Sequence, residues 1–177
     1  MILKQFAQTC AILFIAAASA VAANADFQHG SSARIRTTAY TATEPNGGGF
    51  KSAVGTPLRH SGPIFSAAAD WSWMPLGTVF RMKDNGRIYK VEDYGSALVG
   101  RKTVDIYMPN DSHMNAWGVR NVDIEILEMG SFEKSLEVLK PRQKCSHVRK
   151  MVTALQQREV NGPLIAANTP STEQQAQ

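Results

Sequence analysis

Three aspartates, Asp70, Asp93 and Asp105, occupy strand-like segments in which acidic residues are uncommon. Asp93 ends the strand-like segment Ile88–Asp93, and Asp105 lies in the middle of Thr103–Met108. Carboxyl groups in such places can donate a proton to a substrate and take one back, which is general acid–base chemistry. A single aspartate of this kind more often caps a turn or pairs with a neighbouring base. Together, the three residues favour one acid–base site.

The two-residue period of a strand assigns these acids to different surroundings. Asp105 falls on the polar face of its segment with Tyr107, opposite three apolar side chains. Asp93 falls on the same face as Tyr89 and Val91, at the rim of an apolar surface. Because burial disfavours the charged form of a carboxyl group, the pattern predicts that Asp93 is the more desolvated acid.

Two tryptophans, Trp71 and Trp73, lie one and three positions after Asp70. The flat C–H faces of sugar rings pack well on aromatic rings, so exposed tryptophans beside carboxylates would suit a saccharide groove. Buried tryptophans would instead fill a core. Both interpretations stay open at this point.

Four segments that surround the aspartates carry a recognisable pattern. They are Asp70 with Pro75-Leu76-Gly77, then Glu92-Asp93-Tyr94-Gly95 with Gly100, then Val104-Asp105-Ile106-Tyr107, and Asn115-Ala116-Trp117-Gly118-Val119-Arg120. In this order they resemble the 3D domain, a family named for its three aspartates. The resemblance runs from about Thr37 to Leu127 and extends to the catalytic part of membrane-bound lytic transglycosylase A and to small stand-alone 3D proteins of bacteria.

The resemblance implies a fold and a set of site residues. The fold would be mainly β, a six-stranded double-psi β-barrel, and the activity would be cleavage of the glycan strands of peptidoglycan. Asp105 would be the catalytic acid/base, supported by Asp93 and Asp70. Tyr94 departs from the family's usual Thr, and Val99 from its common Lys. The residues expected to bind substrate are Tyr40, Trp71, Trp73, Tyr94, Gly95, Lys102 and Tyr107.

The implied chemistry is that of a lytic transglycosylase. Asp105 would protonate the leaving oxygen of the MurNAc–GlcNAc bond and then take a proton from the C6 hydroxyl, closing a 1,6-anhydro ring. One alternative is a two-carboxylate hydrolase, in which Asp93 is the partner at roughly 5 to 9.5 Å. Another is a non-catalytic module that binds or loosens the cell wall, similar to expansins.

The composition is that of one domain with a mildly basic surface. The chain has 177 residues, a formal charge of +4, a pI near 9.2 and 44% hydrophobic residues. Such a charge suits weak attraction to an anionic polymer such as cell wall. Basic residues are not interleaved with aromatics as in nucleic-acid binders, and histidines and cysteines do not stand at metal-ligand spacing. We therefore expect no nucleic-acid partner, no metal and no cofactor.

Residues 1–25 have the form of a secretory signal peptide. They contain Lys4, an apolar run over Ala11–Ala18, and Ala23-Asn24-Ala25 as a cleavage site before Asp26. The apolar run is too short for a membrane span, which needs roughly 20 residues. We expect an exported protein, in the periplasm or outside the cytoplasm. After cleavage one cysteine would remain, so no intramolecular disulfide is expected.

Strand patterns and turn residues predict a closed, mainly β barrel over residues 34–130, after a linker at 26–33. Asp-Asn-Gly at 84–86 is a hairpin-turn signal, which makes Asp84 a turn residue. The glycine-rich stretch 46–49 favours a mobile substrate loop over a phosphate site, because no helical pattern follows. The predicted strands lie at 34–41, 64–69, 79–83, 87–93, 103–108 and 121–128, with a short helix at 111–116.

Residues 131–160 form a predicted helical extension, and residues 161–177 a disordered tail. The extension would contain helices at 132–139 and 143–158, the first of them capped by Ser131. These helices would pack on the barrel or, alternatively, attach the protein to the wall or to a partner. The apolar stripe of the second helix consists of Cys145, Val148, Val152 and Leu155.

Overall fold

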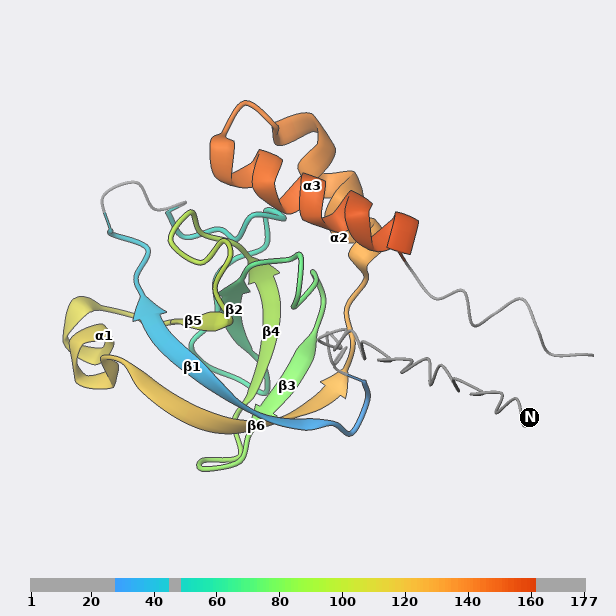
Figure 1. Cartoon of the computed structure of the whole chain (residues 1–177). Coiled ribbons are helices and arrows are strands. Elements are labelled where there is room, and N and C mark those ends of the chain that lie inside the picture. The colour runs from blue at the N-terminus through green and yellow to red at the C-terminus, as the bar shows by residue number, and fades with distance from the viewer. Residues whose placement is uncertain (1–27, 45–48, 162–177) are drawn as a thin grey trace, which may run out of the picture.

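The computed structural model describes residues 28–44 and 49–161. The expected signal peptide, the start of the linker, most of the glycine-rich loop and nearly all of the predicted tail lie outside the described residues. Six strands form a closed barrel with helices at its periphery (Figure 1). They are β1 (Ser32–Tyr40), β2 (Phe65–Ala69), β3 (Val79–Met82), β4 (Ile88–Asp93), β5 (Thr103–Tyr107) and β6 (Arg120–Glu128).

The strands follow one another around the barrel in the order β1-β5-β2-β4-β3-β6. β1 is parallel to β5 and β2 is parallel to β4, while the other four neighbouring pairs are antiparallel. The expected closed, six-stranded, mainly β barrel is therefore confirmed. Its strand order is compatible with double-psi connections.

Local signals in the sequence explain most element boundaries. In the β3–β4 hairpin, Gly86 has φ of 70°, a left-handed conformation that glycine adopts readily, and its N–H donates to the carbonyl of Met82 over 2.8 Å. Asn110 caps the short helix α1 (Asp111–Trp117) by accepting from the N–H of His113. The first strand begins at residue 32 rather than 34, because Ser32 still pairs with β6.

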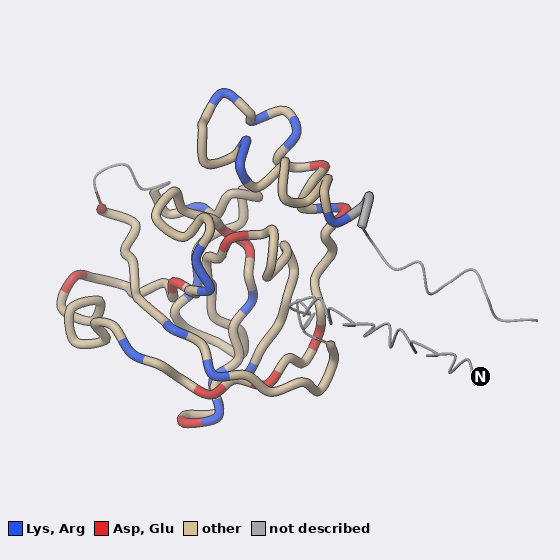
Figure 2. The backbone as a smooth tube through the Cα atoms, viewed as in Figure 1, with Lys and Arg blue, Asp and Glu red and all other residues tan. Residues whose placement is uncertain are grey.

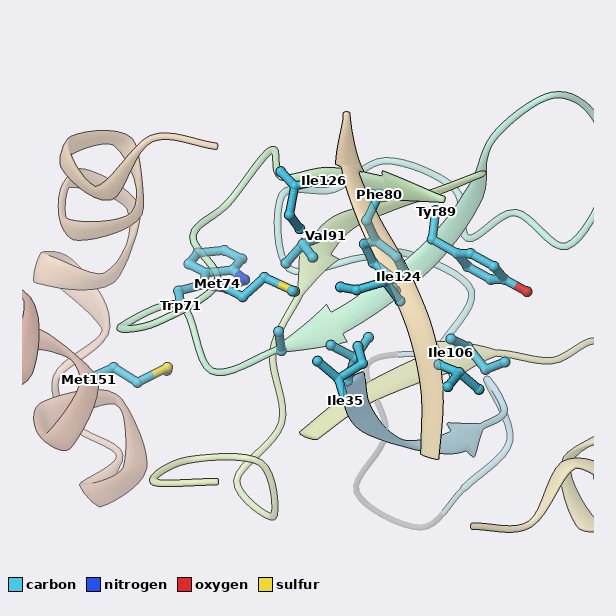
Figure 3. Packing of buried hydrophobic residues seen from close by; sticks show 14 of the residues in the cluster. Ile35, Trp71, Met74, Phe80, Tyr89, Val91, Ile106, Ile124, Ile126 and Met151 are labelled. Carbon is cyan, nitrogen blue, oxygen red and sulfur yellow. The ribbon is translucent and has the colours of Figure 1, made fainter. Parts of the chain in front are cut away.

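Alternate residues of the six strands fill the barrel interior. Val122, Ile124 and Ile126 on β6 are buried, as the strand pattern predicts. Trp71 and Met74 extend this core toward the helical extension (Figure 3). The extension is thus packed on the same hydrophobic core as the barrel.

The extension consists of α2 (Phe132–Leu139), the 3-10 turn η1 (Lys140–Arg142) and α3 (Ser146–Asn161), which lie across one end of the barrel (Figure 1). Ser131 caps α2 as predicted, accepting from the N–H of Lys134. α3 begins three residues later than predicted. Cys145 therefore precedes the helix and is exposed, which corrects its placement on the apolar stripe. The buried stripe of α3 consists of Val148, Met151, Val152 and Leu155.

A close backbone contact fixes α2 to the turn that leads from β2 to β3. The N–H of Leu76 donates to Ser135 Oγ over 2.9 Å, and the N–H of Ser131 donates to the carbonyl of Leu76 over 3.0 Å. A Cβ atom on Gly130 would lie 2.4 Å from the Leu76 carbonyl oxygen. Glycine at residue 130 is therefore required for this approach. In the part of the chain that the structure describes, no helix is long and apolar enough to cross a lipid bilayer.

Candidate functional site

One row of register partners crosses four strands and contains two of the three aspartates. Thr38 pairs with Asp105, Asp105 with Ala68, and Ala68 with Asp93. Because neighbouring strands lie about 4.8 Å apart, the Cα atoms of the two aspartates are about 10 Å apart. The residue between them in the row is Ala68, whose small side chain is buried.

A register shift brings Asp93 into this row. Ala67 pairs with Val91, but Ala68 pairs with Asp93, so Glu92 is an extra residue on β4. One extra residue reverses the side on which the following side chain lies. This corrects the expectation that Asp93 shares the core face of Val91. The predicted two-residue alternation holds along β4 as far as Val91, before the register shift.

Glu92, the extra residue, forms a buried polar cluster at the shift. Its carboxylate accepts from Arg59 over 2.8 Å and from the hydroxyl of Ser66 over 2.5 Å. A buried carboxylate without such partners would be strongly destabilising. The cluster therefore explains how the register shift can be accommodated in the barrel wall.

Asp93 is held at both of its carboxyl oxygens. Oδ1 accepts from the N–H of Ala53 over 3.1 Å and from the N–H of Tyr94 over 2.9 Å, and Oδ2 accepts from the hydroxyl of Tyr40 over 3.2 Å. Burial raises the pKa of Asp93, these three hydrogen bonds oppose the rise, and the charge of Glu92 adds to it. The net direction is upward.

Asp105 has a free oxygen and a strongly shifted pKa. Its Oδ1 is buried and accepts no hydrogen bond from the described residues. Burial raises the pKa of Asp105 to about 6, with the charges of Glu44 and Asp93 acting in the same direction and Thr38 and Arg36 opposing them. A carboxyl group with this pKa can both give and take a proton near neutral pH.

Tyr40 and Tyr107 flank the two acids. They are register partners on β1 and β5, and their ring centroids are 5.6 Å apart. Burial, followed by the nearby charge of Asp93, raises the pKa of Tyr40. The Tyr40 hydroxyl therefore keeps its proton and acts as a hydrogen-bond donor to Asp93.

Asp70 has a different role from the other two acids. It is buried, with Oδ1 accepting from the N–H of Ser72 over 2.8 Å and Oδ2 from the N–H of Gly100 over 2.7 Å. Both oxygens are thus occupied by backbone donors. Asp70 ties the end of β2 to the loop that leads into β5, so it supports the strand that carries Asp105.

The aromatic residues expected to bind substrate are distributed unequally. Trp71 is completely buried, and its indole N–H donates to the carbonyl of Asp93 over 2.9 Å. This corrects its assignment to substrate binding, because a ring without exposed surface cannot stack on a sugar. Trp73 is half-buried and donates to the carbonyl of Arg101 over 3.0 Å. Tyr94 is half-buried, with its ring centroid 5.0 Å from that of Trp71.

Two further residues predicted to bind substrate lie in the loop between β4 and β5. Gly95 is half-buried beside Leu98, and Lys102 is exposed. Their role in substrate binding, like that of Tyr40, Trp73, Tyr94 and Tyr107, stays a prediction. Among the described residues, no group of three or more His, Cys, Asp or Glu side chains is placed to hold a metal ion.

Sequence reasoning missed four residues that act directly on the acids. Thr38, Arg36 and Glu44 influence the pKa of Asp105, and the Ala53 N–H donates to Asp93. Thr38 lies on the polar face of β1, two residues before Tyr40, which is the one available signal. Its relation to Asp105 depends on the β1–β5 register, which a single sequence does not define.

The structure is a closed six-stranded β-barrel. Its wall carries Asp93 and Asp105 in one row, which we call the paired-aspartate site. Residues 65–128 match the family model of the 3D domain. This range runs from β2 to the end of β6 and includes all three aspartates, while β1 and the extension lie outside it. The 3D domain family is typically peptidoglycan-related. No curated protein matches the chain.

Proposed function

We propose that the chain is an exported lytic transglycosylase that cleaves the MurNAc–GlcNAc β-1,4 bond of peptidoglycan glycan strands. The 3D domain supports the choice of peptidoglycan. The observation that carries the proposal is Asp105, with its unoccupied Oδ1 and a pKa of about 6, one small residue away from Asp93 in the same row.

Asp105 acts in both halves of the proposed reaction. In its protonated form it gives the proton to the glycosidic oxygen, so that the bond to the anomeric carbon breaks and the leaving sugar departs as an alcohol. The resulting carboxylate then takes the proton from the C6 hydroxyl as the C6 oxygen bonds to the anomeric carbon. The Asp105 proton is thereby restored, and a 1,6-anhydro end forms without water.

Asp93 and Tyr40 support this cycle. Asp93 is fixed by three hydrogen bonds, so it places negative charge near the oxocarbenium-like transition state without needing to rearrange. Its charge also contributes to the raised pKa of Asp105, which keeps that acid protonated at higher pH. The two acids thus have different roles that follow from their different surroundings.

A two-carboxylate hydrolase is the second candidate. The Cα separation of about 10 Å across Ala68 is compatible with carboxyl groups at the roughly 5 to 9.5 Å that such enzymes use. In that case Asp93 activates a water molecule or attacks the sugar directly. The two mechanisms leave different products, since hydrolysis produces a reducing MurNAc end.

Digestion of purified peptidoglycan tests the proposal. Wild-type protein should clear a peptidoglycan zymogram, and mass spectrometry of the released muropeptides should show 1,6-anhydro ends, lighter than hydrolytic ends by one water. Asp105→Asn should abolish both signals while keeping the fold. Asp84→Asn, a matched change in the exposed β3–β4 turn, should be active.

Three results would change this assignment. Reducing ends throughout would replace the transglycosylase with the hydrolase. Intact sacculi after long incubation with folded protein would favour the non-catalytic wall-binding module, with Tyr94 and Val99 as the first positions to replace by the family's usual residues. Detection of the precursor with residues 1–25 uncleaved in the cytoplasm would contradict export.

A further inference from the structure

The C-terminal extension contacts the backbone segments that hold Asp93. Arg142 Nη1 donates to the carbonyl of Ala53 over 2.8 Å, and the N–H of Ala53 donates to Asp93 Oδ1 over 3.1 Å. On the other side, the rings of His147 and Tyr94 have centroids 6.1 Å apart, and the N–H of Tyr94 donates to the same Oδ1 over 2.9 Å. Both backbone donors to Oδ1 are therefore linked to η1 and α3.

Ala53 lies in segment 49–58, whose other hydrogen bonds in the described part of the chain close within the segment. These are backbone bonds, in which the N–H groups of Ser52, Gly55 and Leu58 donate to the carbonyls of Thr56, Ser52 and Phe50, respectively. The hydrogen bonds that join this segment to the rest of the described chain are those made by Ala53, to Asp93 on one side and to Arg142 on the other. Arg142 therefore joins this segment to the extension, in addition to the packing of Ala53 against the hydrophobic core.

We propose that Arg142 is a positioning residue of the paired-aspartate site, which holds segment 49–58 so that the N–H of Ala53 stays on Asp93. The helical extension then belongs to the working site, although it lies outside the matched 3D domain. The effect of Arg142 on turnover rests on the function proposed above. Its effect on Asp93 does not.

The charge distribution fits this role. Arg142 is exposed and lies in a stretch of the extension rich in Lys and Arg, at the top of the molecule (Figure 2). A guanidinium binding a neutral carbonyl forms a charge-assisted hydrogen bond, which is stronger than a bond between two neutral groups. One exposed side chain can therefore help to hold a segment whose other hydrogen bond to the rest of the described chain is the one from Ala53 to Asp93.

Loss of Arg142 should be visible in the titration of Asp93. The Ala53 N–H stabilises the charged form of Asp93, so its departure should raise the pKa of that carboxyl group. The other groups that face Asp93 are the hydroxyl of Tyr40 on β1, the carboxyl group of Asp105 on β5 and the carboxylate of Glu92 on β4. These stay in place when residue 142 is changed.

The experiment compares full-length wild type with Arg142→Gln, Arg142→Lys and Lys144→Gln. Carbon-detected NMR follows the Asp93 carboxyl group through a pH titration, and hydrogen exchange follows the Ala53 amide. Arg142→Gln should raise the Asp93 pKa by about half a unit or more and make the Ala53 amide exchange at least tenfold faster. Arg142→Lys keeps a donor and should largely restore both values. Lys144→Gln removes a nearby exposed charge and should change neither.

Activity provides the last measurement. On peptidoglycan, Arg142→Gln should lower kcat several-fold with little change in KM, because the site is displaced while the sugar-binding surface is kept. An unchanged Asp93 pKa in Arg142→Gln, or an equal shift in Lys144→Gln, would overturn the proposal. Should Arg142→Gln fail to fold, rapid exchange of the Ala53 amide in wild type would overturn it equally. A shifted Asp93 pKa in Arg142→Gln, together with a wild type that has no lytic activity, would support the positioning role of Arg142 and contradict the proposed transglycosylase activity.

Discussion

The hydroxyl of Tyr40 donates to Asp93 Oδ2 over 3.2 Å, although their strands, β1 and β4, are separated in the barrel by β5 and β2. This hydrogen bond therefore joins two strands that are not neighbours in the barrel. Asp93 is consequently fixed at both oxygens by donors that come from separate parts of the chain.

Tyr40→Phe should therefore weaken the site without unfolding the barrel. It removes one donor to a half-buried carboxylate, an interaction worth about 1.5 to 3 kcal/mol, and the pKa of Asp93 should rise. We expect a loss of lytic activity of about tenfold or more with an unchanged far-UV circular dichroism spectrum. Tyr107→Phe alters the neighbouring ring but leaves the bond to Asp93, so it should affect activity less. Full activity in Tyr40→Phe would show that catalysis does not depend on the hydrogen bond from Tyr40 to Asp93.

The pH dependence of cleavage should follow Asp105. A general acid must be protonated at the start of the cycle, and the pKa of Asp105 is raised to about 6. The kcat/KM of wild type should therefore fall as pH rises through about 6, with an apparent pKa that belongs to the coupled pair of aspartates. Rates measured between pH 4.5 and 8 on purified sacculi check this. A rate that rises steadily over this interval would assign the proton donor elsewhere.

The same shift should make the folded state less stable at higher pH. Because the folded-state pKa of Asp105 lies above its ordinary value of 3.8, the native protein binds more protons than the unfolded chain between about pH 4 and 6. The contribution of this protonation to the free energy of unfolding is fully present below pH 4 and is lost as pH rises through 6. Asp105→Asn should remove the loss and stabilise the protein at pH 7 by roughly 1 to 3 kcal/mol.

Urea unfolding at pH 4 and pH 7 measures this difference. The gain from Asp105→Asn should be larger at pH 7 than at pH 4, because the wild-type carboxyl group is largely protonated at the lower value. A gain that is the same at both pH values would mean that the asparagine acts by packing and not by removing a charge.

Ala68→Val tests whether substrate approaches the row between the two acids. Ala68 is buried, and valine adds two methyl groups to a packed row, which typically costs about 1 to 3 kcal/mol. The larger side chain should also separate the carboxyl groups from a bound glycan strand and reduce lysis strongly. Ala68→Gly creates no such obstacle and should retain more activity. Equal activity in the two variants would show that substrate does not approach the row between Asp93 and Asp105.

Gly130→Ala should be among the most damaging single changes in the chain. An added Cβ would lie 2.4 to 2.6 Å from backbone atoms of Leu76, Thr78 and Pro75, which cannot move as a side-chain end can. We expect a loss of more than about 3 kcal/mol in the free energy of unfolding or a failure to accumulate folded protein. Gly95→Ala, whose Cβ would meet only the Leu98 side chain at 3.6 Å, should change thermal stability little.

The barrel could be predicted because local signals agree with each other along the chain. Val122, Ile124 and Ile126 alternate with polar residues, and Asp84-Asn85-Gly86 marks a turn that the structure contains. These features depend on neighbours within a few residues. The closed barrel and its six strands follow from them, together with the resemblance of the aspartate segments to the 3D domain.

The site was harder to predict from the sequence than the barrel, because its geometry depends on contacts between distant segments. The face of Asp93 was predicted wrongly because Glu92 is an extra residue relative to β2, and the strand period contains no trace of that shift. Trp71 could equally have been exposed or buried until the position of α3 was known. The need for glycine at 130 likewise arises from the backbone of another segment.

The strand order also constrains the way in which the chain folds. β1, the first strand, pairs with β5 and β6, so residues 32–40 find their partners more than 60 positions later. Such non-local pairing slows folding, because a long loop must close before its contacts contribute stability. An elongating chain cannot complete the barrel until Glu128 has emerged. Both aspartates of the row are synthesised before that point, and they acquire their shared environment when β6 closes the barrel.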